Sequence, residues 1–127
     1  MPFSAILRRL TERSGASGAV LVDRDGEVVA SHPQPPPAPP AGSEGLDMPL
    51  VGAHHAIVIE RIREASSRAL PGAGPVKGTL ISTTGASVVI STVKEGLCLV
   101  VLTGGGAAGK VLFESGRAVR LIEEEMG

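Results

Sequence analysis

Residues 18–30 have the sequence GAVLVDRDGEVVA, in which two runs of mostly β-branched or aliphatic residues flank an Asp25-Gly26 pair. Asp-Gly is a strong signal for a tight turn between antiparallel strands, because glycine readily adopts the positive φ that such turns need. The stretch therefore predicts a β-hairpin and places antiparallel pairing near the start of the chain.

Two segments have helical features, one before the hairpin and one after the proline-rich residues 33–40. Phe3, Ile6, Leu7 and Leu10 repeat at the interval expected for a helix with one buried face, and Gly15 supplies its end. Asp47 is a suitable N-cap for a second helix that extends to about residue 70. Pro49 is compatible with this helix, because proline is tolerated in a first turn. We expect helices over both segments.

The second half of the chain contains three β-rich runs and then a last helical stripe. The runs cover residues 76–84, 86–93 and 97–102, and the stripe extends from Val111 to Met126. The predicted order is α-β-β-α-β-β-β-α. This order indicates an α+β domain with a five-stranded antiparallel sheet flanked by helices.

The length and composition of the chain limit its architecture and its partners. At 127 residues, the chain has the length of one domain, and residues 33–40 contain six prolines, so we expect a proline-rich loop at about 33–47. A net charge of −1 and only two aromatic residues argue against nucleic-acid binding. No apolar run is long enough to span a bilayer, so we expect no membrane insertion and a cytoplasmic location.

Residues that could carry chemistry are few. Cys98 is the only cysteine, and it lies between aliphatic residues, which predicts a buried and unreactive thiol. His54 and His55 have no adjacent carboxylate to orient an imidazole. Neither a cofactor, nor a metal, nor a catalytic group is expected, and we interpret the chain as a protein that is not an enzyme.

The segment from Gly104 to Lys110 matches the G-x-x-x-x-G-K pattern of a phosphate-binding loop between a strand and a helix. Val111 stands where such loops have the serine or threonine that holds Mg²⁺, and only sixteen residues follow. A glycine-rich turn is the favoured interpretation. Nucleotide binding through this segment is kept as an alternative.

The central helix is apolar on more than one side. Residues 48–59 have no formal charge at neutral pH, with Val51 and Val58 on one face, Leu50 and Ile57 on a second, and Ile59 toward the opposite side. One face can lie on the sheet, but a domain of this size has no further layer for another. A partner subunit is the expected cover, and the alternative is that the loop at 33–47 folds over this face.

The order of elements and several landmark segments resemble the Roadblock family, which includes dynein light chains, scaffold subunits for Rag-type GTPases and bacterial MglB-type GTPase regulators. The segments are Gly18–Ala30, Glu95–Leu102, Gly109–Phe113 and the pair Arg117-Ala118. The resemblance implies a profilin-like or longin-like fold. It also implies a homodimer, or a heterodimer with another Roadblock protein, in which the central helix and the strand after it pair with their equivalents.

The resemblance further implies that the chain binds a small Ras-like GTPase as a non-enzymatic regulator or adaptor. Because the loop at 33–47 contains no arginine, we expect any stimulation of GTP hydrolysis to act on the GTPase's own switch regions without an arginine finger. The alternative is a structural scaffold or localisation module without GTPase contact, with Pro35, Pro36 and Pro37 as candidate partner contacts. The residues assigned to the dimer or partner interface are Leu50, Val51, His54, His55, Val58, Ile59, Ile62 and Leu80.

Overall fold

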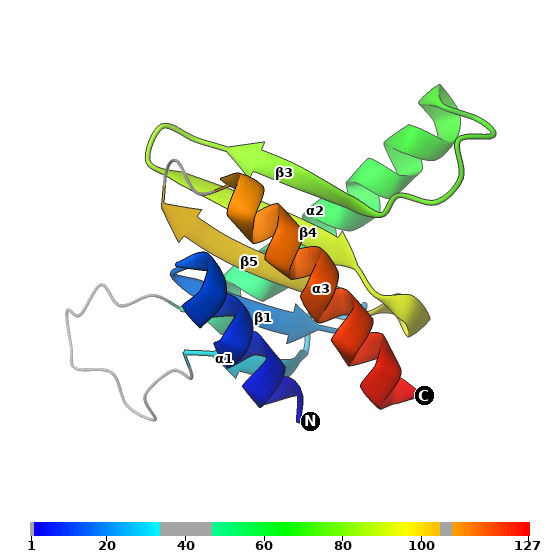
Figure 1. Ribbon diagram of the computed structural model, residues 1–127. Coiled ribbons are helices and arrows are strands. Elements are labelled where there is room, and N and C mark those ends of the chain that lie inside the picture. Colours follow the sequence, from blue (N-terminus) through cyan, green and yellow to red (C-terminus); the bar gives the residue numbers. More distant parts are fainter. Residues whose placement is uncertain (1, 34–46, 105–107) are drawn as a thin grey trace.

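Three layers make up the protein, with α1 and α3 on one side of a central sheet and α2 on the other (Figure 1). The computed structural model describes residues 2–33, 47–104 and 108–127. Most of the proline-rich loop, including Pro35, Pro36 and Pro37, lies outside the described residues. The elements are α1 (Phe3–Ser14), β1 (Gly18–Val22), β2 (Val28–His32), α2 (Met48–Ala69), β3 (Gly78–Ser82), β4 (Ala86–Thr92), a 3₁₀ turn (Lys94–Gly96), β5 (Cys98–Gly104) and α3 (Ala108–Met126).

The sheet has the strand order β2-β1-β5-β4-β3, and every neighbouring pair is antiparallel. This arrangement confirms the predicted α+β class and the predicted order of elements. It also joins the hairpin β1–β2 to the meander β3–β4–β5 through the pairing of β1 with β5. Strands β2 and β3 are therefore the two edges.

The turn of the first hairpin forms as its sequence predicts. The Asp23 carboxylate accepts hydrogen bonds from the backbone N–H groups of Asp25 and Glu27, at 2.9 and 3.0 Å. Gly26 adopts a φ of +82°, which strains any residue with a side chain. A β-bulge lies beside the turn, where the register shifts between Leu21 and Val22.

The two faces of the sheet have separate apolar clusters. The cluster under α1 and α3 combines side chains from both helices with alternate residues of β1, β4 and β5. Its buried members are Ile6, Leu7, Leu10, Ala19, Leu21, Val89, Val93, Leu99, Val101, Val111, Ala118 and Ile122. The cluster under α2 uses the intervening residues, and its buried members are Val20, Val22, Met48, Ala56, Ile59, Ile90, Cys98 and Val100.

Candidate functional site: an open apolar face beside α2

Helix α2 begins at a capped end and lies against the first strands of the sheet. The Asp47 carboxylate accepts a hydrogen bond from the backbone N–H of Leu50 at 3.1 Å, as expected for an N-cap. Gly52 faces β1 so closely that an added Cβ would lie 2.7 Å from a methyl group of Val22. The absence of a side chain at Gly52 thus allows the helix to approach the sheet.

One flank of α2 is covered by the chain itself. A Cβ at Gly26 would lie 3.4 Å from the Cα of Ala53, so the turn of the first hairpin packs against this flank. The stripe formed by Val51, Val58 and Ile62 lies on the other flank, because these residues are about 160° away from Ala53 around the helix. That stripe packs against the same buried cluster as residues of β3 and β4 do.

The sheet presents a matching set of apolar side chains beside this stripe. Ile81, Val88 and Leu102 come from β3, β4 and β5, and they pack at the margin of the α2 cluster while remaining partly exposed. Val51, Val58 and Ile62 are partly exposed as well. We call these six residues the open face, because α2 covers mainly β1, β2 and β5.

Strand β3 forms the edge of the sheet next to the open face. Its residues, GTLIS, include neither a charge nor a proline, which are the usual protections of an exposed edge. The opposite edge differs, since β2 has a bulge beside it and Pro33 directly after it. Within the described residues, β3 pairs only with β4. Its outer backbone groups are thus available to a further strand.

The structure places the predicted interface residues in four different locations. Val51, Val58 and Ile62 lie together on the open face, and the half-buried His55 follows the same flank, with its Nδ1 2.7 Å from the Val51 carbonyl oxygen. Leu50 and His54 are exposed on the outer side of α2, where Leu50 is 54% accessible.

Two other predicted residues lie elsewhere. Ile59 is only 2% exposed and belongs to the core under α2, so its assignment to the interface is corrected. Leu80 lies opposite Val89 in the β3–β4 register, and Val89 belongs to the cluster under α1 and α3. Leu80 is thus on the edge strand but on the other sheet face from the α2 stripe.

Three members of the open face, Ile81, Val88 and Leu102, were not identified from the sequence. Ile81 and Leu80 are adjacent aliphatic residues in β3, as are Val88 and Val89 in β4. Strict alternation of apolar and polar residues would have shown which of them faces α2, but both members of each pair are apolar. Only the register of the strands settles the question.

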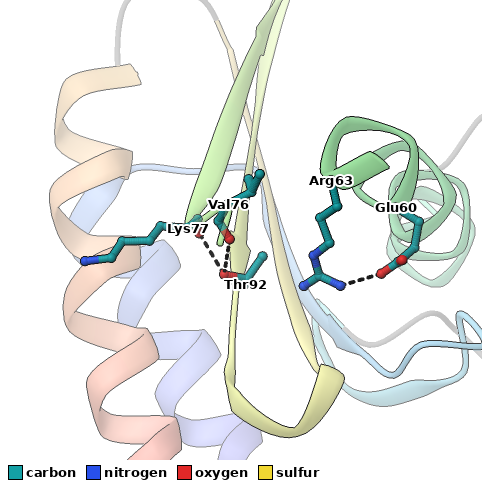
Figure 2. Close-up of polar contacts among 5 residues, drawn as sticks. All are labelled: Glu60, Arg63, Val76, Lys77 and Thr92. Atoms are coloured by element: carbon teal, nitrogen blue, oxygen red, sulfur yellow. Dashed lines mark hydrogen bonds and ion pairs between the residues drawn. The ribbon is translucent and has the colours of Figure 1, made fainter. Parts of the chain in front are cut away.

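The arginines of α2 do not form a free cationic group on the open face. Arg63 forms an ion pair with Glu60 one turn earlier, on the α2 side of the sheet (Figure 2). Arg61 pairs with Glu64 at 4.0 Å and is largely exposed. In the same view, the Thr92 hydroxyl donates to the carbonyl oxygens of Val76 and Lys77 at 3.0 and 3.1 Å, which fixes the chain where it enters β3.

The chemistry-bearing groups of the chain are few. Cys98 is buried under α2, and the loss of hydration there raises the pKa of its thiol to about 11. The neighbouring Arg63 opposes that rise, and Glu60 adds to it. Residues 2–33, 47–104 and 108–127 contain no group of three histidine, cysteine or acidic side chains that could hold a metal.

The glycine-rich segment before α3 is only partly described. Residues 105–107 lie outside the described residues, whereas Gly109 and Lys110 are in the first turn of α3 and are exposed. Val111, the next residue, is completely buried in the cluster under α1 and α3. The position that would hold Mg²⁺ in a phosphate-binding loop is therefore part of the core.

In the described part of the chain, no helix combines the length and the apolar character that crossing a membrane requires.

The chain is similar to proteins of a known family. The family model for the Roadblock/LC7 domain matches residues 3–103, and the chain therefore belongs to this family. No curated protein sequence is significantly similar to it.

Several solved structures share the fold. MglB from Myxococcus xanthus is 18% identical with a TM-score of 0.80, over 98% of this chain and 94% of that one. A Roadblock/LC7 domain from Streptomyces avermitilis is 23% identical with a TM-score of 0.79, over 97% and 96%. Profilin IA from Acanthamoeba castellanii is 11% identical with a TM-score of 0.58, over 98% and 99%, in agreement with the predicted profilin-like class.

Proposed function

We propose that the protein is a dimeric, non-enzymatic regulator or adaptor of a small Ras-like GTPase, and that the open face forms its dimer contact. The observation that carries the dimer is the open face itself, an apolar surface continuous with the core and bordered by an unprotected edge strand. A second copy of the chain would cover the open face and pair with the edge strand. Its β3 extends the sheet across the edge, and its α2 covers Val51, Val58 and Ile62.

Membership of the Roadblock/LC7 family supports the GTPase part of the proposal, together with the fold shared with MglB. In this proposal the protein acts by binding the GTPase and not by chemistry of its own. The loop at 33–47 contains no arginine, which supports stimulation through the GTPase's switch regions, without a donated arginine. A cytoplasmic location fits such a partner.

The first experiment has two parts. Light scattering at micromolar concentration should give twice the 12.9 kDa mass of the chain. Single-turnover GTP hydrolysis by a Ras-like GTPase from the same source should then accelerate only when this protein is added. Co-elution without acceleration identifies an adaptor. A monomer mass contradicts the dimer, and hydrolysis by this protein alone would establish the phosphate-loop alternative.

Variants of the α2 arginines test whether one of them is donated to the GTPase. Arg61→Ala, Arg63→Ala and Arg68→Ala should each retain most of the stimulation. A single variant that abolishes stimulation while it still binds the GTPase would show that an arginine is donated.

A further inference from the structure

A second surface of the protein lies on the opposite side of the sheet from the open face. Helices α1 and α3 pack side by side there (Figure 1), and a shallow furrow follows their line of contact. Its polar lining consists of Arg9 and Arg13 from α1 and Glu114 and Arg117 from α3. Leu10 and Leu121 contribute apolar parts of the same furrow.

The furrow has an excess of positive charge. Three arginines share it with one carboxylate, and none of the three forms an ion pair with any residue that the structure describes. The remaining arginine of α1, Arg8, differs from them, because it pairs with Glu12 at 3.9 Å outside the furrow.

The excess continues along α3 and is not offset by the acidic residues at its end. Lys110 and Arg120 are exposed on the outer side of α3, on the same ridge as Arg117. Residues 123–125 are glutamates, but they are in the last turns of the helix, and Glu123 accepts a hydrogen bond from the backbone N–H of Lys94 at 3.0 Å. In a chain with a net charge of −1, this basic strip is a local feature.

An exposed aromatic side chain stands within the strip. Phe113 is 68% accessible, more than any other large apolar side chain described. It is three residues from Lys110 and four from Arg117, so all three lie on one ridge of α3. Leu112, the preceding residue, is also exposed. Arginine is among the residues that contribute most to binding energy at protein interfaces, and the exposed aromatic ring beside Arg117 adds apolar area that a partner can cover.

We propose that the α1–α3 surface, formed by Arg9, Arg13, Lys110, Phe113, Arg117 and Arg120, binds an acidic segment of a partner protein. Carboxylates of the segment pair with the furrow arginines, whose planar guanidinium groups can bind them through two hydrogen bonds. An apolar side chain of the segment covers Phe113. A flat anionic membrane fits less well, because the furrow contains Glu114, and the exposed apolar side chains beside it that the structure describes are Leu112 and Phe113.

The surface is separate from the open face, because the whole sheet lies between them. One molecule can therefore bind a second copy through α2 and an acidic segment through α1 and α3 at the same time. The inference does not depend on the proposed GTPase function.

The experiment measures binding of a fluorescein-labelled amphipathic peptide, with glutamates flanking a leucine stripe, to the full-length protein by fluorescence anisotropy. The test variant is Arg13→Glu with Arg117→Glu. The matched control is Arg8→Glu with Arg68→Glu, which changes the net charge equally at exposed positions outside the furrow. We expect the test variant to weaken binding by about tenfold or more and the control by less than about twofold.

Two further variants separate the apolar contribution and the two surfaces. Phe113→Ser should weaken binding at low salt and also at high salt, where screening reduces only the charged contacts. Val58→Glu, on the open face, should bind the peptide as the unchanged protein does.

Several results would overturn the proposal. One is that the peptide does not bind at low salt. Another is that the test and control variants weaken peptide binding equally. A third is that the protein binds only vesicles rich in phosphatidylserine. Circular dichroism of each variant establishes that the fold is retained.

Discussion

The two sides of the sheet differ in how completely the chain covers them. Helices α1 and α3 lie side by side and together cover one face, with members from both helices in the cluster beneath. Helix α2 lies alone on the other face, and the partly exposed Val58, Ile81 and Val88 remain beside it. Two helices thus complete one layer, and the layer with one helix leaves room for a partner.

Neighbouring residues on α2 also differ in how far they are covered. Ile57, Val58 and Ile59 are consecutive, and the structure places them outward, toward the open face and into the core, respectively. Their substitutions should therefore produce three different effects, although their side chains are similar in size and character.

The largest effect is expected at Ile59. Ile59→Ala should lower the free energy of unfolding by about 2–5 kcal/mol, because it removes buried methyl and methylene groups and leaves a cavity under α2. Urea denaturation followed by circular dichroism measures the loss. Ile57→Ala is the matched control, since Ile57 is 64% exposed on the same helix, and its effect should stay within about 0.5 kcal/mol. Equal losses would contradict the placement of Ile59 in the core.

Val58→Glu should dissociate the proposed dimer while the subunit remains folded. A charge without a partner in an apolar contact costs several kcal/mol, whereas in the free subunit the same carboxylate reaches water. Light scattering should change from twice the chain mass to the chain mass. Val28→Glu, the same substitution at an exposed site near the opposite edge of the sheet, should leave the dimer intact. A Val58→Glu protein that stays dimeric would exclude this face as the contact.

The pKa of the Cys98 thiol reports how completely α2 shields the sheet face beneath it from water. Burial raises the pKa of the folded thiol to about 11 from an ordinary 9.0, so the unfolded chain loses this proton first as the pH rises. Stability should therefore fall between about pH 9 and 11, by at most about 1.4 kcal/mol per pH unit from this group.

The measurement is urea denaturation across that pH range, with Cys98→Ala as the control. The control should lose this component of the pH dependence. An identical decline in both proteins would show that the thiol is not protected by α2.

Gly52→Ala tests the close approach of α2 to β1. An added methyl group would overlap the side chains of Val20 and Val22, and alanine's better helix propensity offsets only part of that cost. The net loss of stability should be about 1–2 kcal/mol. Thermal unfolding measures it, and Gly116→Ala on α3, where a Cβ meets nothing within 4 Å, should be neutral or stabilising. A stabilising Gly52→Ala would show that α2 lies farther from the sheet.

The smallest effect is expected on the well-covered side. The Ser115 hydroxyl is buried between α3 and the sheet, and it has no hydrogen-bond partner among the residues that the structure describes. Ser115→Ala should therefore raise the free energy of unfolding, by about 1 kcal/mol, because a buried polar group without a partner is removed. Thermal unfolding would detect the increase. A decrease would indicate that the hydroxyl is hydrogen-bonded after all.

Local patterns were sufficient to predict the elements and their order. The Asp25-Gly26 turn, the Asp47 cap and the helical spacing of α1 and α3 depend on residues close together in the chain, so their signals survive without tertiary information. The buried Cys98 followed from its aliphatic neighbours in the same way. The apolar character of α2 on several sides was also visible, and it indicated correctly that one helix face would remain uncovered by the sheet.

The sequence by itself thus determined the α+β class, the strand count and the helix that is only partly covered. The tertiary structure alone decided that Ile59 faces the core, that Leu80 lies on the opposite sheet face, and that Ile81, Val88 and Leu102 complete the open face. The physical reason is that both residues of an apolar pair such as Leu80-Ile81 satisfy the strand pattern equally well. Only pairing with a distant strand gives each side chain its face.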